Sequence, residues 1–384
     1  MSTAKSFDEI NEKIRNGKAV VLTAEEVSRM SLELKPSEIA KKVDVVTTGT
    51  FAPMCSSGVF INFGHSDPPI RMQNVLLNNV PAYGGIAAVD AYLGATQTAM
   101  DRTDYGGAHV IEELLSGKDI KLKATSCGTD CYPRKEIETI INKETVNEII
   151  LFNPRNAYQN YPVAVNSSKK TLYTYMGMLF PNYRNATYST SGELSPLLND
   201  PELRTIGIGT AIFLSGAKGF VAWNGTQFNT KKPRNSLGIP VSNAATLSVI
   251  GNLKEMSPDF LKAAYYRKYG VSIFIGIGIP IPVIDEDIAK SVSVRNEQIE
   301  TIICDYGTSG HPEIGRTNYK ALQDGFIELN GKRIRTASMS SMFKARQIAE
   351  TLKNWIKKDK FQINEPVQQL PFNTSLNSLK IRSE

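Results

Sequence analysis

Residues Val43–Gly58, VDVVTTGTFAPMCSSG, decide how the N-terminal part of this chain folds. They begin with an apolar, β-branched run that predicts a strand. An earlier strand candidate, Ala19–Leu22, precedes a helix start at Thr23, and strand–helix–strand order predicts a parallel pair. Loops at the carboxyl ends of parallel strands carry the chemistry of α/β proteins. Cys55, in the loop that follows, therefore lies where a functional residue is expected.

Helices are predicted where capping residues or apolar positions recur at three- and four-residue spacing. The predicted helices start at Ser6 (paired with Glu9) and Thr23 (paired with Glu26), and occupy Ile111–Gly117, Arg134–Glu144 and an amphipathic stretch through Ala345–Ile356.

Apolar runs rich in isoleucine and glycine dominate residues 203–284 and predict buried strands, since each glycine would weaken a helix by about 1 kcal/mol. We therefore expect an α/β protein of mixed sheets with helices packed on them. Its N-terminal part would be α/β, and the part after about residue 200 richer in strands. Residues 1–360 would form a catalytic core, in one or two lobes that divide near residue 200. Residues 361–384 would form a polar tail on the surface.

The composition is that of an ordinary globular protein, with 41% apolar and 21% charged residues. The N-terminus lacks a secretory pattern, and the longest apolar run, Val271–Ile284, is too short to cross a bilayer. These features predict a cytoplasmic protein that binds no membrane. Aromatic and basic residues do not interleave, so no nucleic acid is expected. Residues 331–384 hold eleven Lys and Arg against four Asp and Glu. This excess suits a solvated helix face or an acidic partner.

The four cysteines are scattered, and the chain has only three histidines. Zinc and iron–sulfur sites use closely spaced cysteine pairs, so no metal site is predicted. Cys304, within a strand-like run, is expected to be a buried, inert thiol.

Ser126–Glu136, SCGTDCYPRKE, contains two of the cysteines. Pro133 suits the first position of the helix predicted to follow. Cys131 would then lie at the positive end of that helix, which favours thiolate over thiol. Asp130 opposes this effect, and an inert buried thiol is the alternative.

Cys55 is followed by two serines and a glycine, whose backbone N–H groups could surround an anionic sulfur. Two activated thiols far apart in the sequence indicate sulfur transfer or thiol redox chemistry, in which one thiol carries sulfur and the other resolves the intermediate.

Several segments together resemble the homocysteine biosynthesis (HcyBio) family, the L-aspartate semialdehyde sulfurtransferases of methanogenic archaea and some anaerobic bacteria. They span residues from about 45 to 285 and occur in the family's order. The segments are PMCSSGVFINFGH, PAYGGIAAVDAYLGAT, YGGAHVIEELLSGK, GTDCYPRKEIET, NPRNAYQNYPVAVN, GELSPLLNDP, TIGIGTAIFL and GIGIPIP.

The resemblance implies an enzyme that makes homocysteine from aspartate semialdehyde, sulfide or a persulfide donor, and two electrons. It implies that Cys131 carries sulfur as a persulfide and that Cys55 is the second thiol. If Cys127 is close to Cys131, it is an alternative resolving thiol. Electrons are expected from a separate ferredoxin-type iron–sulfur protein, with no tightly bound cofactor.

The chemistry needs a general acid and a carboxylate holder. His65 is the candidate acid, with Tyr132 as the alternative. Arg155, Arg134 and Arg71 are candidates for the substrate carboxylate, because arginine binds carboxylates with two hydrogen bonds. Arg155 is the first choice.

The basic residues Lys353, Lys357 and Lys358 could steer an acidic electron donor. A homo-oligomer is left open. Two other functions remain as alternatives: a non-catalytic persulfide carrier or scaffold, and a CoA-transferase-like enzyme that handles acyl groups.

Overall fold

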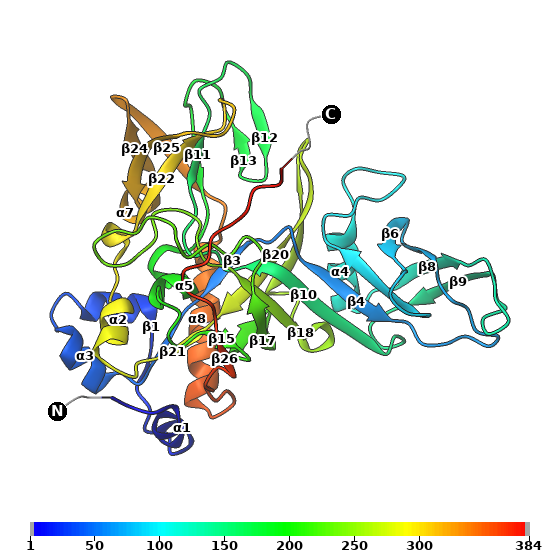
Figure 1. Ribbon diagram of the computed structural model, residues 1–384, viewed down its shortest axis with the longest axis horizontal. Helices are drawn as coiled ribbons and strands as arrows, with labels where there is room; N and C mark the ends of the chain where they lie inside the picture. Colours follow the sequence, from blue (N-terminus) through cyan, green and yellow to red (C-terminus); the bar gives the residue numbers. More distant parts are fainter. Residues whose placement is uncertain (1–3, 381–384) are drawn as a thin grey trace.

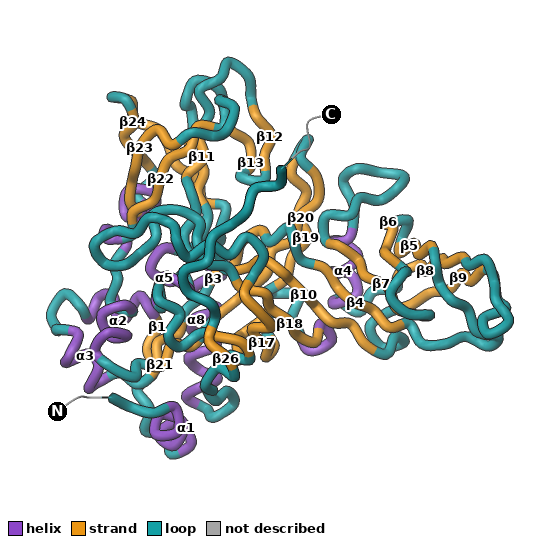
Figure 2. Tube along the Cα trace, viewed as in Figure 1, coloured by secondary structure: helices purple, strands orange, loops and turns teal. Residues whose placement is uncertain are grey.

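A computed structural model describes residues 4–380 of the chain. Strands outnumber helices among these residues, and the N-terminal helices gather at the lower left of the view (Figures 1 and 2). The fold is mixed α/β, as the sequence predicts.

The N-terminal unit confirms both predicted capping boxes. Ser6 caps α1 (Phe7–Arg15), and Thr23 caps α2 (Ala24–Met30). The predicted parallel pair is also present: β1 (Val21–Thr23) pairs in parallel with β2 (Val45–Thr47). The unit is completed by α3 (Pro36–Lys42) and by β21 (Pro280–Pro282), which pairs antiparallel with β2.

The largest sheet has thirteen strands in the order β19-β20-β16-β17-β18-β10-β4-β7-β6-β5-β8-β9, with β3 paired to β20. Its strands are β3 (Thr50–Pro53), β4 (Gly58–Asn62), β5 (Asn74–Leu77), β6 (Val80–Tyr83), β7 (Asp90–Gly94), β8 (Ile120–Thr125), β9 (Glu136–Ile141), β10 (Glu148–Asn156), β16 (Ala211–Leu214), β17 (Ala217–Asn224), β18 (Leu247–Asn252), β19 (Leu261–Tyr266) and β20 (Gly270–Gly278). β10 pairs with β18, so one sheet joins segments from both sides of residue 200. The strand-rich region consequently begins near residue 50, earlier than expected.

The sheet curves around α4 (Gly107–Leu115), which packs against β19 and β20 on one side and against β4, β7 and β8 on the other. Glu112 of α4 accepts hydrogen bonds from the Lys262 side chain and the Ala263 backbone of β19. These bonds tie the helix to the edge strand of the sheet.

A second sheet has six strands in the order β23-β22-β11-β14-β25-β24, and β22, β24 and β25 lie at the upper left of Figure 1. Its strands are β11 (Val163–Val165), β14 (Ala186–Tyr188), β22 (Glu300–Asp305), β23 (Glu313–Asn318), β24 (Phe326–Leu329) and β25 (Lys332–Ser338). α7 (Tyr319–Gln323) packs on it and closes a separate hydrophobic core.

Several other elements are short. They are β12 (Leu172–Thr174) paired with β13 (Gly177–Leu179), β15 (Gly207–Ile208) paired with β26 (Gln368–Gln369), the helices α5 (Pro196–Asn199) and α6 (Glu286–Ser291), and the 3-10 turns η1 (Gly192–Leu194), η2 (Leu253–Glu255) and η3 (Asn296–Gln298).

One local expectation is wrong. The helix predicted at Arg134–Glu144 is instead the edge strand β9, which pairs with β8 along its whole length. Ion pairs from Lys121 to Glu138 and from Lys123 to Glu136 cross between these strands. Pairing with β8 outweighs local helix propensity.

The segment after Lys360 is anchored in part: Phe361, Ile363 and Leu370 are buried, and β26 pairs with β15. Most of residues 371–380 are exposed.

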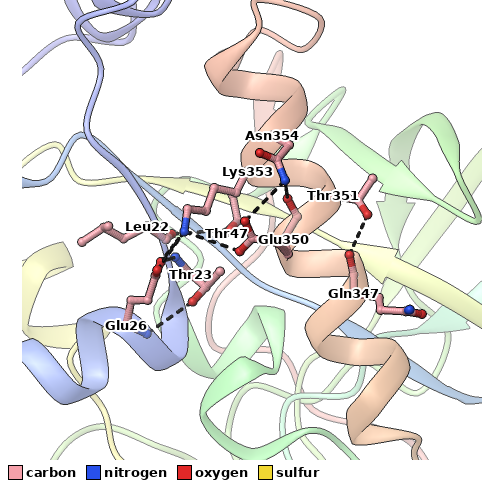
Figure 3. Close-up of polar contacts among 9 residues, drawn as sticks. All are labelled: Leu22, Thr23, Glu26, Thr47, Gln347, Glu350, Thr351, Lys353 and Asn354. Carbon is pink, nitrogen blue, oxygen red and sulfur yellow. Dashed lines mark hydrogen bonds and ion pairs between the residues drawn. The ribbon is translucent and has the colours of Figure 1, made fainter.

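The amphipathic helix near the C-terminus is confirmed as α8 (Met342–Lys357), whose apolar side packs against β20 and β3. Lys353 of this helix is buried and points toward α2 (Figure 3). Its Nζ lies 2.8 Å from Glu26, the residue that completes the capping box with Thr23. Burial opposes ionisation of Glu26, but the bonds from Lys353 and Thr23 hold its pKa below the ordinary value. This pair therefore stabilises the fold above the unfolded carboxyl pKa, and its contribution falls as the pH drops through the folded value.

Replacing Lys353 by methionine is expected to lower the free energy of unfolding by about 2 kcal/mol. This value lies between the ~1 kcal/mol of exposed pairs and the 3–5 kcal/mol lost when buried pairs are broken. Urea denaturation at pH 7 measures the change. Lys357→Met, at an exposed position of the same helix, is the control, with an expected change within about 0.5 kcal/mol. Equal effects of the two substitutions would contradict the role of the pair.

No helix within residues 4–380 is long and apolar enough to span a membrane.

Candidate active site

A cavity of about 680 Å³ lies where the thirteen-stranded sheet approaches the segments that lead to the second sheet. Cys55 and Arg155, two of the residues singled out from the sequence, line it together. Hydroxyl groups surround them, from Ser56, Thr50, Thr96, Thr98, Tyr158, Tyr161, Tyr175, Tyr269, Ser189, Thr190 and Ser195. The cavity thus combines a thiol, a guanidinium group and several proton donors.

The loop that carries Cys55 is fixed to the end of β10. Ser56 Oγ lies 3.1 Å from Asn153 Oδ1, and the Asn153 side chain donates to Ser57 Oγ at 2.7 Å. The same Asn153 oxygen accepts from the Arg155 backbone N–H at 2.7 Å. Asn153 is fully buried, so one side chain sets the position of the thiol loop relative to the arginine.

The Cys55 sulfur lies 3.0 Å from the hydroxyl of Ser272, a buried residue of β20. Burial raises the pKa of the Cys55 thiol, although the hydroxyls of Ser272 and Tyr269 and the Cys55 backbone N–H favour the thiolate. The thiol in this cavity is therefore protonated at neutral pH in the absence of other charges. This setting differs from the anion-holding nest expected from CSSG, because burial outweighs the donors.

Alkylation of Cys55 by iodoacetamide is expected to be slow at pH 7 and to accelerate as the pH rises past the ordinary thiol range, because only the thiolate reacts. Ser272→Ala should slow alkylation about tenfold at a given pH, since a hydrogen bond to a charged group contributes about 1.5 kcal/mol. Peptide mapping by mass spectrometry measures both rates. The exposed Cys127 and Cys131 serve as internal controls. Equal rates at Cys55 in the two proteins would contradict the role of Ser272.

Arg155 stands at the cavity end of β10. Its Nε donates to Thr226 Oγ1 at 3.0 Å, and its guanidinium lies beside the hydroxyl of Tyr158. Burial raises the pKa of the Tyr158 phenol, while Arg155 acts in the opposite direction. The guanidinium is thereby oriented at the cavity wall, where it can meet a carboxylate with two parallel bonds.

Tyrosine rings form the wall facing the second sheet. The rings of Tyr158 and Tyr161 pack edge to face at 5.0 Å, and Tyr175 packs edge to face against Tyr161 and Tyr269. The hydroxyls of Tyr175 and Tyr306 lie 2.6 Å apart. The hydroxyls of Tyr175 and Tyr306 are therefore hydrogen-bonded to each other, whereas the Tyr269 hydroxyl lies beside Cys55.

Two residues that line this cavity have left-handed backbone. Ala157 and Thr190 line it with φ values of 49° and 72°. Left-handed backbone is unfavourable for residues with a Cβ, most of all for β-branched ones, and such strain clusters at functional sites. Thr190 is held by a 2.5 Å bond from its Oγ1 to the hydroxyl of the buried Tyr319.

The other predicted site residues gather elsewhere, in two adjoining loops spanning residues 64–73 and 126–135. Cys127, Cys131 and His65 are exposed there, and the His65 ring stacks on Tyr132 at 6.3 Å. Arg134 donates to the backbone oxygens of Pro68 and Asp67, at 2.9 and 2.7 Å. Arg71 is exposed in the first of these loops. None of these residues lines the cavity of Cys55.

Cys131 does not lie at a helix N-terminus, because the helix predicted after it is strand β9. Its loop is a turn in which the Thr129 and Tyr132 backbones bond each other. Cys131 therefore has no helix end beside it that would favour its thiolate. Its assignment as sulfur carrier stays a prediction.

Strand register separates the two thiol regions. Cys55 lies just before Gly58, at the end of β4 that pairs with Gly94 of β7. The Cys131 loop follows Thr125 of β8. The register from β7 through β6 and β5 to β8 shows that this loop leaves the strands toward their opposite end. Four strand spacings of about 4.8 Å also lie between β4 and β8, roughly 19 Å. Figure 1 shows β8 and β9 at the right-hand end of the molecule and β3 near its centre. A ten-residue loop anchored at both ends does not close this distance within one chain.

The basic patch expected on the C-terminal helix is smaller than predicted. Lys353 is buried and paired with Glu26 and Glu350, so it faces no partner (Figure 3). Lys357 and Lys358 are exposed.

Cys304 is buried in β22, as predicted. Among the described residues, no three His, Cys, Asp or Glu side chains converge as metal ligands.

Sequence reasoning did not single out Ser272 and Tyr269. The sequence does contain an indication of Ser272. Its hydroxyl lies inside the otherwise apolar run VSIFIGIGIPIPVI, where a buried polar group needs a partner. Tyr269 stands among other tyrosines in a turn between β19 and β20 and has no comparable local signal.

Residues 19–363 match the family model described as "Homocysteine biosynthesis enzyme, sulfur-incorporation". The chain belongs to this family. It is 52% identical over 379 residues to the L-aspartate semialdehyde sulfurtransferase of Methanosarcina acetivorans, covering 98% of this chain and 74% of that protein. It is 51% identical over 384 residues to the protein of the same name from Methanocaldococcus jannaschii, covering 95% and 73%. No solved structure matches.

Membership in the homocysteine biosynthesis family identifies the chain as an enzyme with sulfurtransferase activity. The family relatives also extend beyond it, since the chain spans about three quarters of their length.

Proposed function

We propose that this enzyme is an L-aspartate semialdehyde sulfurtransferase that forms L-homocysteine through a cysteine persulfide. The net reaction combines the aldehyde, hydrogen sulfide, two electrons and two protons, and yields the thiol and water. Two homologues that share about half of its residues bear this name. The observation that carries the proposal is the presence of Cys55 and Arg155 in one cavity of about 680 Å³.

In this proposal the cavity binds aspartate semialdehyde. Arg155 holds the α-carboxylate, because its guanidinium is already oriented at the wall by Thr226 and Tyr158. The aldehyde then lies toward Cys55, within reach of the surrounding hydroxyls.

The sulfur chemistry balances as a cycle. A persulfide on Cys131 adds to the aldehyde carbon, and the adduct gains two electrons and loses water. The Cys55 thiolate next attacks the Cys131 sulfur, forms a disulfide and releases homocysteine. Sulfide attacks that disulfide at Cys131, which restores the persulfide and the Cys55 thiol. Electrons come from a ferredoxin-type protein, for which Lys357 and Lys358 are exposed cations.

Because the two thiol regions of one chain lie at opposite ends of the sheet, we propose that Cys131 acts on the cavity of a second copy. The exposed loop of one chain would enter the open cavity of its neighbour. Cys127 of the same loop then remains the alternative resolving thiol.

Two observations weigh against the alternatives. A CoA-transferase-like enzyme needs a catalytic carboxylate, and no aspartate or glutamate of the described residues lines this cavity. A purely carrier role does not require a cavity that contains both a thiol and an oriented arginine.

The test is to incubate the purified protein with aspartate semialdehyde, sulfide and a low-potential reductant, and to measure homocysteine by mass spectrometry. Catalytic formation over many turnovers supports the proposal. Formation of a protein-bound persulfide without homocysteine would contradict it and favour the carrier role.

A further inference from the structure

Addition of sulfur to an aldehyde creates negative charge on the carbonyl oxygen, which needs a proton donor within the cavity. The residues considered for this role from the sequence, His65 and Tyr132, lie in the loops at the far end of the sheet and do not line the cavity. Within one chain, the proton donors available in the cavity are those of its wall, whereas Tyr132 would reach a cavity only with the loop of a second copy.

Four tyrosines line the wall, and their contacts differ. The Tyr158 hydroxyl lies beside Arg155, and the Tyr175 hydroxyl is hydrogen-bonded to that of Tyr306 at 2.6 Å. Tyr161 packs its ring edge to face against Tyr158 and Tyr175. Tyr269 alone among them has its hydroxyl at the Cys55 sulfur.

The turn before β20 brings Tyr269 to this place. Lys268 adopts φ 58° and Gly270 φ 134°, and the Tyr269 backbone N–H bonds the Tyr266 oxygen at 2.9 Å. β20 then begins, and Ser272 reaches the same sulfur at 3.0 Å. Two hydroxyls from one turn-and-strand segment therefore flank one thiol, one on the fully buried side and one at the partly exposed mouth.

We propose that Tyr269 is the proton donor to the carbonyl oxygen when sulfur adds to the aldehyde. The proposal rests on the proposed function, which brings the aldehyde carbon to a sulfur beside Cys55. A sulfur electron pair forms the carbon–sulfur bond, and the C=O π pair moves to oxygen. The Tyr269 proton passes to that oxygen. The phenolate then regains a proton from water at the cavity mouth.

The geometry suits Tyr269 as the proton donor better than it suits Ser272. The carbonyl oxygen is attached to the carbon that bonds the incoming sulfur, so it lies close to the Cys55 side chain. Ser272 is fully buried behind the thiol and has no access to water for reprotonation, whereas Tyr269 is 42% exposed. Burial raises the pKa of Tyr269, with negative charge on Cys55 adding to the rise, so the phenol keeps its proton at neutral pH.

Tyr269→Phe is expected to lower kcat about 100-fold with KM nearly unchanged, the usual contribution of a general acid. Tyr265→Phe is the matched control, because it removes a phenol hydroxyl of similar exposure from the neighbouring strand β19 that does not line the cavity. Its kcat should stay within about threefold. Unchanged thermal unfolding of both variants confirms that the fold is kept.

A second variant tests whether the Tyr269 phenol transfers its proton. Replacing Tyr269 by a difluorotyrosine keeps the ring and hydroxyl but acidifies the phenol. The alkaline limb of the kcat profile should then move to lower pH, which a merely structural hydroxyl would not cause. A wild-type kcat in Tyr269→Phe, or an unmoved alkaline limb, would overturn the inference. If the wild-type protein makes no homocysteine, the proposed function itself fails, and the two failures are distinct.

Discussion

Homocysteine formation by Cys131→Ser protein is expected to fall by a factor on the order of 10³ or more, because a hydroxyl cannot carry sulfane sulfur. The assay uses aspartate semialdehyde, sulfide and reductant at saturating levels. Cys127→Ser is the control, since it removes an exposed thiol from the same loop. Its activity should stay above a tenth of wild type. Retention of activity in Cys131→Ser would remove this residue from the mechanism and leave the cavity thiol as the sulfur carrier.

Mixing inactive variants tests whether sulfur passes between chains. Cys131→Ser protein keeps its cavity, and Arg155→Met protein keeps its loop. If a twofold dimer forms by random exchange, half the dimers are mixed and each has one complete site, so activity returns to about a quarter of wild type. Cys131→Ser mixed with a protein carrying both substitutions is the control and should stay inactive. No recovery after subunit exchange would place the transfer within one chain.

The second large effect is expected at Arg155. Arg155→Met should lower kcat/KM for aspartate semialdehyde about 100-fold, because two charge-assisted bonds to the carboxylate are lost. Arg155→Lys should lose about tenfold, since lysine keeps the charge but not the paired geometry.

The matched control for Arg155 is a change of substrate. 3-Aminopropanal has the aldehyde and the amine but no carboxylate. Wild-type enzyme should prefer aspartate semialdehyde to it strongly, and Arg155→Met should not. Equal loss on both substrates would mean that Arg155 acts through the loop of Cys55, which it contacts through the Asn153 and Ser56 bonds.

Local chemistry predicted the N-terminal unit well. The capping boxes at Ser6 and Thr23 depend on residues three positions apart, and the parallel pair β1–β2 on two short apolar runs. The buried strands after residue 203 and the helix α8 were equally visible as apolar patterns. These features depend on neighbours in the sequence, so a single sequence reveals them.

The segment Arg134–Glu144 shows the limit of this reasoning. Its alternating Glu, Lys and Ile residues suit either a helix or an edge strand, and only pairing with β8 selects the strand. The environment inferred for Cys131 followed from the wrong choice and failed with it.

The sequence by itself determined the family, and it supplied Cys55, Cys131 and Arg155 as candidates for a thiol-based chemistry, because these reside in short motifs. Only the tertiary structure decided which of them meet. Strand register brings Cys55, Arg155 and Tyr269 into one cavity from segments a hundred or more residues apart, with Ser272 behind the thiol, and it sends Cys131 to the opposite end of the sheet. The physical reason is that sheet pairing is set by side-chain packing between distant strands, and no local pattern in the chain records which strands will pair.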